Sequence, residues 1–343
     1  MRVIAVWLAI LMLLAPAAAT PARPADFQSA EDILTWINRY RIKPEPDRLP
    51  FAVQAMSRLG AFRDPESSGV YVGFIAGVIG ANPQRADDLV ERSFPISAED
   101  HWAIVRAIAH SGLPDWKPLL NRHASRMPTR GVMISKYIDG SLPNLTATVP
   151  TKEPPMTDRV KRIFTREKPK GPTVDWALDV SPEVLDMLWG QYFASGDYGP
   201  ILRIVGMLPW STDRDSVDKL TLGAMAKYTL TSNAARDHGL LIMLKRAARH
   251  QPEDTGKILK QVTEAADTMH IAPIRKEMLA AIEDLKRKGP GSKRDVMTWG
   301  RVGEGAIALG CIGAAVAGQI ALGLPCVIGG AVTSAALRGI AGP

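Results

Sequence analysis

The sequence has few cysteines, few aromatic residues and few of the patterns that predict strands. Only 2 of its 343 residues are cysteine, which excludes a small domain held together by several disulfides. Aromatic residues make up 6%, and alternating runs of β-branched residues are scarce, so little in the chain predicts a sheet. Apolar residues make up 46%, which is enough for a folded core and excludes an intrinsically disordered chain.

The common catalytic and metal-binding motifs are also missing. The six histidines form neither an HExxH nor an HxH arrangement, and the chain contains no GxSxG and no GxxxxGK[ST] sequence. We therefore predict no cofactor and no metal ion. An enzyme whose acid and base come from distant helices stays an alternative, because such a pair leaves no pattern in the sequence.

Residues 1–19 have the pattern of a secretory signal peptide. Arg2 supplies the positive charge, an uninterrupted apolar stretch runs from Val3 to Leu14, and Ala17-Ala-Ala19 supplies the small residues at which such a peptide is cut. The stretch is shorter than the roughly 20 residues of a membrane span. We predict an exported protein whose mature chain starts at residue 20; an uncleaved membrane anchor is the alternative.

Helix signals recur along the mature chain. Ser181-Pro-Glu183 combines a capping hydroxyl, a proline at the first helical position and an acid at the positive end of the helix dipole. A second start is predicted at Ser97, and apolar periodicity predicts further helices over 30–40, 51–59, 70–79, 84–92, 199–207, 215–230, 239–250, 252–269 and 273–288. The predicted fold class is all-α.

Two segments of the chain have a similar order of predicted helices, turns and prolines. The distance from Asn82 to Pro95 equals that from Gly196 to Pro209, and in both segments a tight turn, a short helix, proline and a longer helix follow an apolar helix. His250 opens a third, divergent copy. We predict an irregular helical-repeat array of the TPR-like or α-solenoid kind, in two lobes over 20–126 and 176–289. Chance similarity between short helical units is the alternative.

The block Leu188-Trp-Gly-Gln-Tyr-Phe-Ala-Ser-Gly-Asp197, with the Pro-Ile-Leu-Arg-Ile-Val that follows, carries a resemblance. The segment Leu188–Val205 resembles a segment of uncharacterised exported helical-repeat proteins of Proteobacteria. The resemblance implies a helix-turn-helix unit and a bacterial cell envelope setting. It implies no activity, because its motif is not catalytic.

Between the predicted lobes, residues 127–175 are rich in proline and contain a basic cluster that includes Arg159, Lys161 and Arg162. We interpret this region as a linker whose basic cluster could dock on anionic lipid or on an acidic partner; a solvated linker is the alternative. Trp189, Tyr192 and Trp210 are candidates for an interaction groove. Their helical spacing favours core packing over such a groove.

The C-terminal tail, residues 290–343, is unusual because Gly305 to Leu337 carries no formal charge and is rich in glycine and alanine. Gly310, Gly313, Gly318 and Gly323 are candidate helix-packing residues in an apolar helix or hairpin. So many glycines make a poor isolated helix in water, so the tail needs a membrane, a partner or the protein's own core. Cys311 and Cys326 are either a disulfide pair or free buried thiols.

These features together predict an exported, non-catalytic helical interaction module of the bacterial cell envelope, periplasmic or secreted, with its tail attached to membrane or partner. The expected partner is a protein; an anionic membrane surface and self-association through the tail are further options. The net charge of +7 suits an anionic surface, and no nucleic acid is expected because the chain is predicted to leave the cytoplasm. The alternative from another class is a protein that inserts into membranes and oligomerises through its tail.

Overall fold

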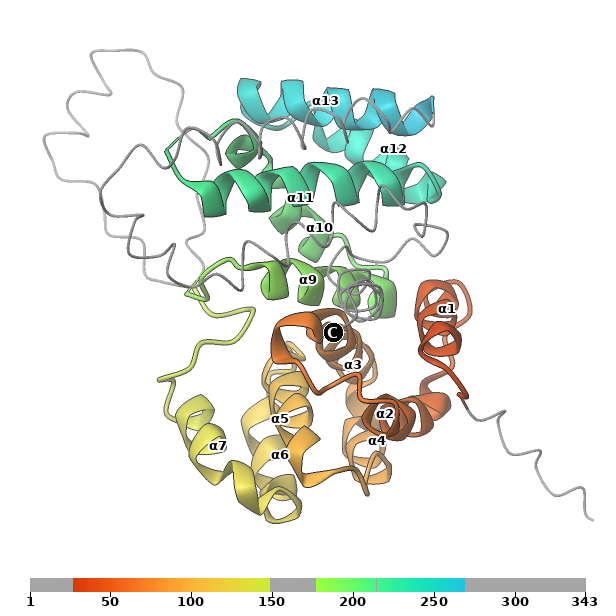
Figure 1. The fold of residues 1–343 in the computed structure, drawn as a ribbon, viewed down its shortest axis with the longest axis vertical. Coiled ribbons are helices and arrows are strands. Elements are labelled where there is room, and N and C mark those ends of the chain that lie inside the picture. Colours follow the sequence, from red (N-terminus) through yellow and green to blue (C-terminus); the bar gives the residue numbers. More distant parts are fainter. Residues whose placement is uncertain (1–26, 149–176, 214, 269–343) are drawn as a thin grey trace, which may run out of the picture.

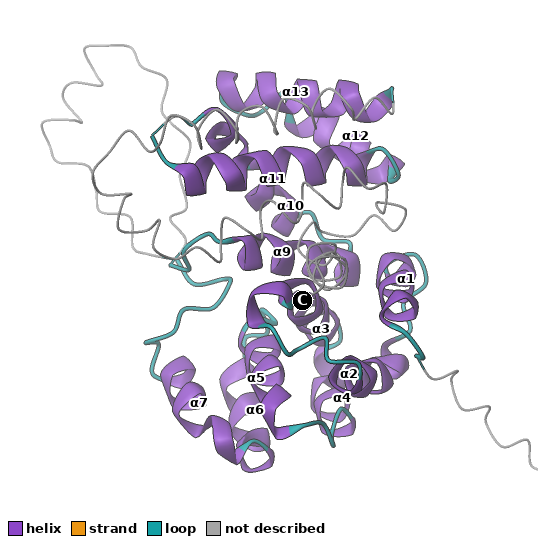
Figure 2. Ribbon diagram, in the orientation of Figure 1, coloured by secondary structure: helices purple, strands orange, loops and turns teal. Residues whose placement is uncertain are grey.

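The computed structural model of the chain describes residues 27–148, 177–213 and 215–268 (Figure 1). Within these residues the chain forms twelve α-helices and no strand, so the predicted all-α class is confirmed there (Figure 2). The predicted signal peptide, the helix predicted over 273–288 and the tail lie outside the described residues.

The helices follow one another with short turns and 3-10 segments between them. In chain order they are α1 (Ala30–Tyr40), α2 (Leu49–Arg58), α3 (Gly69–Ala81), α4 (Ala86–Arg92), α5 (His101–Ala109), α6 (Trp116–His123), α7 (Gly131–Ile138), α9 (Pro182–Ser195), α10 (Gly199–Val205), α11 (Val217–Ala234), α12 (His238–Ala247) and α13 (Glu253–Asp267).

Local capping explains where the clearest helices begin and end. Ser29 and Asp32 form a capping box at α1, in which each side chain accepts a backbone N–H from the other residue, at 3.1 and 2.9 Å. The Ser181 hydroxyl accepts the Val184 N–H at 3.3 Å, as the sequence predicted for α9. Gly196, with φ of 70°, ends that helix in the left-handed conformation.

Two sequence predictions about local structure are wrong. Ser97 does not cap α5, because a 3-10 turn over Ala98–Asp100 comes first and the Ser97 side chain makes no capping hydrogen bond. The linker predicted over 127–175 starts too early, because α7 lies inside it. Tyr137 of α7 is buried against the rings of His110 and Trp116, at centroid distances of 5.7 and 6.4 Å, and this packing stabilises a short helix.

The centre of the molecule is the contact between α3 and α9, which come from opposite sides of the predicted linker. Their backbones approach so closely that a Cβ on Gly73 would lie 2.1 Å from the Met187 carbonyl oxygen, and one on Gly190 would lie 2.3 Å from that of Val70. Gly69 and Gly77 lie in the same contact one turn to either side. Only glycine allows this approach, as in the GxxxG packing of helices.

Figure 1 shows α9 between the helices α1–α7 and the helices α10–α13. On the first side, Trp36 and Tyr40 of α1 pack edge-on against Phe74 of α3, with ring centroids 5.1 Å from it. On the second side, Trp189 of α9 lies buried against α11, to which its Nε1 donates a hydrogen bond. The helices on both sides therefore share one continuous core.

Candidate interaction site on helix α1

Helix α1 turns one face to the core and leaves the other face open. Its outward residues Thr35 and Arg39, together with Ile42 in the turn that follows, have the i, i+4, i+7 spacing of one helix face and border two separate hollows. We call these three residues the α1 ridge. Ile42 is 75% exposed, although it is fully apolar. The buried face consists of Ile33, Leu34, Trp36, Ile37 and Tyr40.

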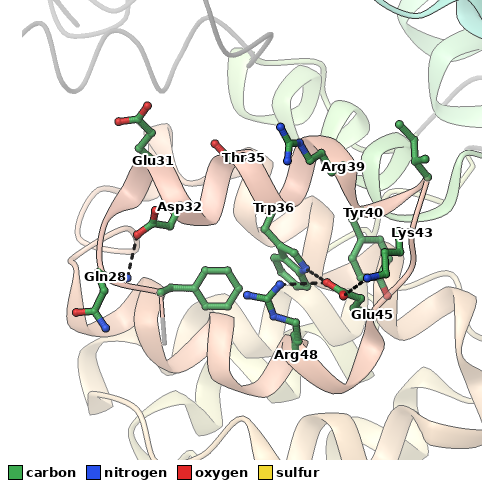
Figure 3. Close-up of a pocket in the computed structure, with 12 residues that line it drawn as sticks. Gln28, Glu31, Asp32, Thr35, Trp36, Arg39, Tyr40, Lys43, Glu45 and Arg48 are labelled. Atoms are coloured by element: carbon green, nitrogen blue, oxygen red, sulfur yellow. Dashed lines mark hydrogen bonds and ion pairs between the residues drawn. The ribbon is translucent and has the colours of Figure 1, made fainter. Parts of the chain in front are cut away.

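The larger hollow, of about 850 Å³, lies on one side of the α1 ridge (Figure 3). Its floor is aromatic: Phe27 and Trp36 lie with ring centroids 5.2 Å apart, and Trp36 meets Tyr40 edge-on at 5.3 Å. The Arg48 guanidinium lies over two of these rings, 4.8 Å from Phe27 and 5.7 Å from Trp36. The floor is rigid because its rings are almost completely buried.

Glu45 closes one end of the larger hollow. One of its carboxylate oxygens accepts hydrogen bonds from Trp36 Nε1 at 3.2 Å and from Arg48 Nη1 at 3.1 Å, and Lys43 pairs with the other oxygen at 3.3 Å (Figure 3). The hydrogen bond from Arg48 is the main reason that the pKa of Glu45 lies below its usual value. Glu45 is therefore ionised at neutral pH, with its charge already paired.

The smaller hollow, of about 290 Å³, lies on the other side of the α1 ridge, against α9, the end of α11 and the start of α12. At its base, one oxygen of Asp237 accepts from the Tyr192 hydroxyl at 2.5 Å and pairs with Arg41 at 2.5 Å, and the other accepts the Leu240 N–H at 3.0 Å. The Arg41 guanidinium also lies over the Tyr192 ring, 5.2 Å from its centroid. Burial, and then the bond to Asp237, raise the pKa of Tyr192, so the phenol stays a donor.

The aromatic residues considered for an interaction groove belong to the core, which is the alternative that their spacing favoured. Trp189 is 0% exposed and donates to Thr229 Oγ1 at 3.1 Å, and Tyr192 is 1% exposed. Trp210 is partly buried against the same core. Their helical spacing directs these side chains inward, as the core-packing interpretation expected, so Trp189 offers no surface to a partner. Tyr192 reaches the candidate site only through its hydroxyl.

The remaining predicted site residues lie outside the described residues. They are Arg159, Lys161, Arg162, Gly310, Cys311, Gly313, Gly318, Gly323 and Cys326.

Sequence reasoning missed the residues that form the candidate site. The periodicity of residues 30–40 does show that Thr35 and Arg39 face away from the apolar stripe. No pattern, however, brings Asp237 next to Arg41, because almost 200 residues separate them and only the packing of α1 on α9 joins them.

A buried polar cluster lies apart from the α1 ridge, around His110. Its Nδ1 accepts the Leu145 N–H at 3.1 Å, which places the ring proton on Nε2, 3.4 Å from the Tyr137 hydroxyl. Gln191 of α9 donates to the His110 carbonyl at 2.8 Å. Burial, reinforced by Arg106 and Arg203, lowers the pKa of His110 to about 3. We interpret this neutral histidine as a structural residue whose hydrogen bonds hold α5, α7 and α9 together.

Two further findings concern the described part of the chain only. No group of three or more His, Cys, Asp or Glu side chains is placed there so that it could hold a metal ion. Among the same residues, no helix combines the length and the hydrophobicity needed to cross a membrane.

Three comparisons with known proteins give no match. No protein-family model matches the chain, and neither the curated proteins nor the solved structures give a significant match. The resemblance to exported helical-repeat proteins therefore stays a prediction, and the functional argument has to come from the geometry of the chain itself.

Proposed function

We propose that this chain is an exported helical-repeat interaction module that binds a protein partner through the α1 ridge. The observation that carries the proposal is the shape of that face: an exposed ridge, ending in the apolar side chain of Ile42, stands between two hollows. A ridge with a hollow on each side gives a partner both an apolar anchor and complementary recesses. The rings beneath it are fixed by packing, so binding would cost little reorganisation.

The α3–α9 contact supports the helical-repeat part of the proposal. Gly69 contacts Glu183, Gly73 contacts Met187 and Gly77 contacts Gln191, and the partners in each pair are 114 residues apart. The same separation relates the two segments that the sequence analysis compared. An α-solenoid requires that the first helices of neighbouring repeats pack side by side in register, as α3 and α9 do.

The order of elements agrees with a repeat. Each of the two segments has a long helix, a short helix and a further helix, which are α3, α4 and α5 in the first and α9, α10 and α11 in the second. Arrays of this kind usually present a surface to another protein. Export is proposed on the pattern of residues 1–19, and attachment through the tail on the uncharged segment 305–337.

The test of this function compares two equally exposed apolar residues on different helices. Ile42→Asp introduces a charge on the α1 ridge, and Val132→Asp does the same on α7, where Val132 is also 75% exposed. We expect Ile42→Asp to lower recovery of the native partner from envelope extracts at least about tenfold and Val132→Asp to leave it unchanged. Equal recovery by both variants would overturn the proposal.

A further inference from the structure

We propose that the partner presents an acidic segment to the α1 ridge, with a carboxylate side chain entering the smaller hollow. This inference rests on the proposed function and names the chemistry of the partner. It is carried by the balance of charge around the hollow. Asp237 is the one carboxylate that lines it and is paired with Arg41, whereas Arg39, which also lines it, has no ion pair within the described residues.

The Asp237 carboxylate leaves Arg39 without a counter-charge in this hollow, because it is already engaged by other groups. The two oxygens of Asp237 accept from Arg41, from the Tyr192 hydroxyl and from the N-terminal turn of α12 through Leu240. These contacts hold Arg41 in place over the Tyr192 ring. A positioned guanidinium keeps further N–H donors, which suit the two oxygens of an incoming carboxylate.

Arg39 supplies the accessible charge. It lies on the exposed face of α1 in Figure 3, and within the described part of the chain its side chain makes no hydrogen bond or ion pair. An arginine with free donors favours an anion over a cation by both charge and hydrogen bonding.

The charges along α1 give the bound segment a direction. Glu31 and Asp32 lie in the first turn of the helix, whereas Arg39, Arg41 and Lys43 lie at its end and just beyond. The acidic groups of the partner should therefore lie at the Ile42 end of the ridge, and an apolar side chain of the partner should lie beside Ile42 itself. A mixed acidic and apolar peptide satisfies both requirements.

The geometry favours a peptide over an anionic membrane. A flat bilayer surface gains from several exposed apolar side chains in one plane, whereas the α1 ridge offers the single side chain of Ile42. The charge at Arg41 is recessed beside a hollow of about 290 Å³, which a protruding side chain can enter. Membrane binding is therefore an outcome that the test must exclude.

The test selects peptides from a random display library on the full-length, processed protein. We expect the enriched peptides to contain more Asp and Glu than the starting library, next to an aliphatic or aromatic residue. Arg39→Gln should weaken binding of a selected peptide about tenfold, and added salt should weaken it further. Arg63→Gln is the matched control, because Arg63 is also exposed and has no ion pair among the described residues.

Three results would overturn the inference: no enrichment of acidic residues, equal binding by Arg39→Gln and the wild type, or Arg39-dependent binding to vesicles of phosphatidylcholine and phosphatidylglycerol without peptide binding. Its failure is distinguishable from failure of the proposed function. If Ile42→Asp abolishes partner recovery while Arg39→Gln does not, only the acidic segment is refuted. If Ile42→Asp has no effect, the interaction module itself is refuted.

Discussion

Replacing Gly73 by alanine should destabilise the protein, unlike most exchanges of glycine for alanine inside a helix. In the middle of a helix this exchange normally stabilises by up to about 1 kcal/mol, because alanine has the better helix propensity. Here the new Cβ would lie 2.1 Å from the Met187 carbonyl oxygen and 2.5 Å from its Cα, whereas ordinary contacts begin near 3.4 Å. Helices α3 and α9 would have to separate by more than an ångström.

The cost of that separation can be estimated from overpacking. An extra methylene in a tight core costs about 1–3 kcal/mol, and the upper end applies because the obstacle is backbone, which cannot change rotamer. The gap would also weaken dispersion contacts along the whole helix pair. Subtracting the gain in helix propensity leaves a net loss of about 2 kcal/mol in the free energy of unfolding.

The assay is urea denaturation followed by circular dichroism, with Gly131→Ala as the control. Gly131 begins α7, and a Cβ built on it has no neighbour within 4 Å, so this variant should be as stable as the wild type or more so. Gly190→Ala, with its Cβ 2.3 Å from the Val70 oxygen, should behave like Gly73→Ala, and the double variant should lose less than the sum. A Gly73→Ala protein as stable as the wild type would refute the close α3–α9 contact.

Two further predictions concern buried polar side chains. Because the pKa of His110 is about 3 in the folded protein and near 6.5 when unfolded, protons bind preferentially to the unfolded state, and stability falls as the pH drops below about 6.5. Between neutral pH and about pH 4.5 the free energy of unfolding should fall by roughly 2–3 kcal/mol in the wild type, and His110→Asn should lack this loss. Equal losses in the wild type and in His110→Asn, measured by urea denaturation at the two pH values, would contradict the prediction. Trp189→Phe should lower the free energy of unfolding by about 2 kcal/mol, because it removes ring volume and leaves Thr229 Oγ1 without the indole donor at 3.1 Å; an unchanged urea midpoint would contradict the burial of this ring.

Much of the secondary structure was predictable because its signals are local. The capping residue Ser181 places the start of α9 correctly, and the apolar periodicity places α1 correctly. Helices α6 and α7 were missed because they are short, and the second of them lies in a region rich in proline. Such helices gain their stability from packing, as Tyr137 does against His110, rather than from their own sequence.

The α3–α9 contact had a signal that was overlooked. Gly69, Gly73 and Gly77 repeat every four residues within an apolar helix, which is the small-residue pattern considered only for the C-terminal tail. The α1 ridge had no such signal. Its hollows depend on how α1 sits against α9 and α12, and the aromatic residues most suggestive of binding proved to fill the core.

Site-specific photocrosslinking tests partner binding at the α1 ridge most directly. A photoreactive residue is placed at Ile42 in one strain and at Val132 in another, and the native cells are irradiated. Because the two positions are equally exposed, random collisions label both equally. The account predicts one discrete crosslinked protein at position 42, competed by a selected acidic peptide, and none at position 132. The same weak, diffuse crosslinks at both positions would contradict it.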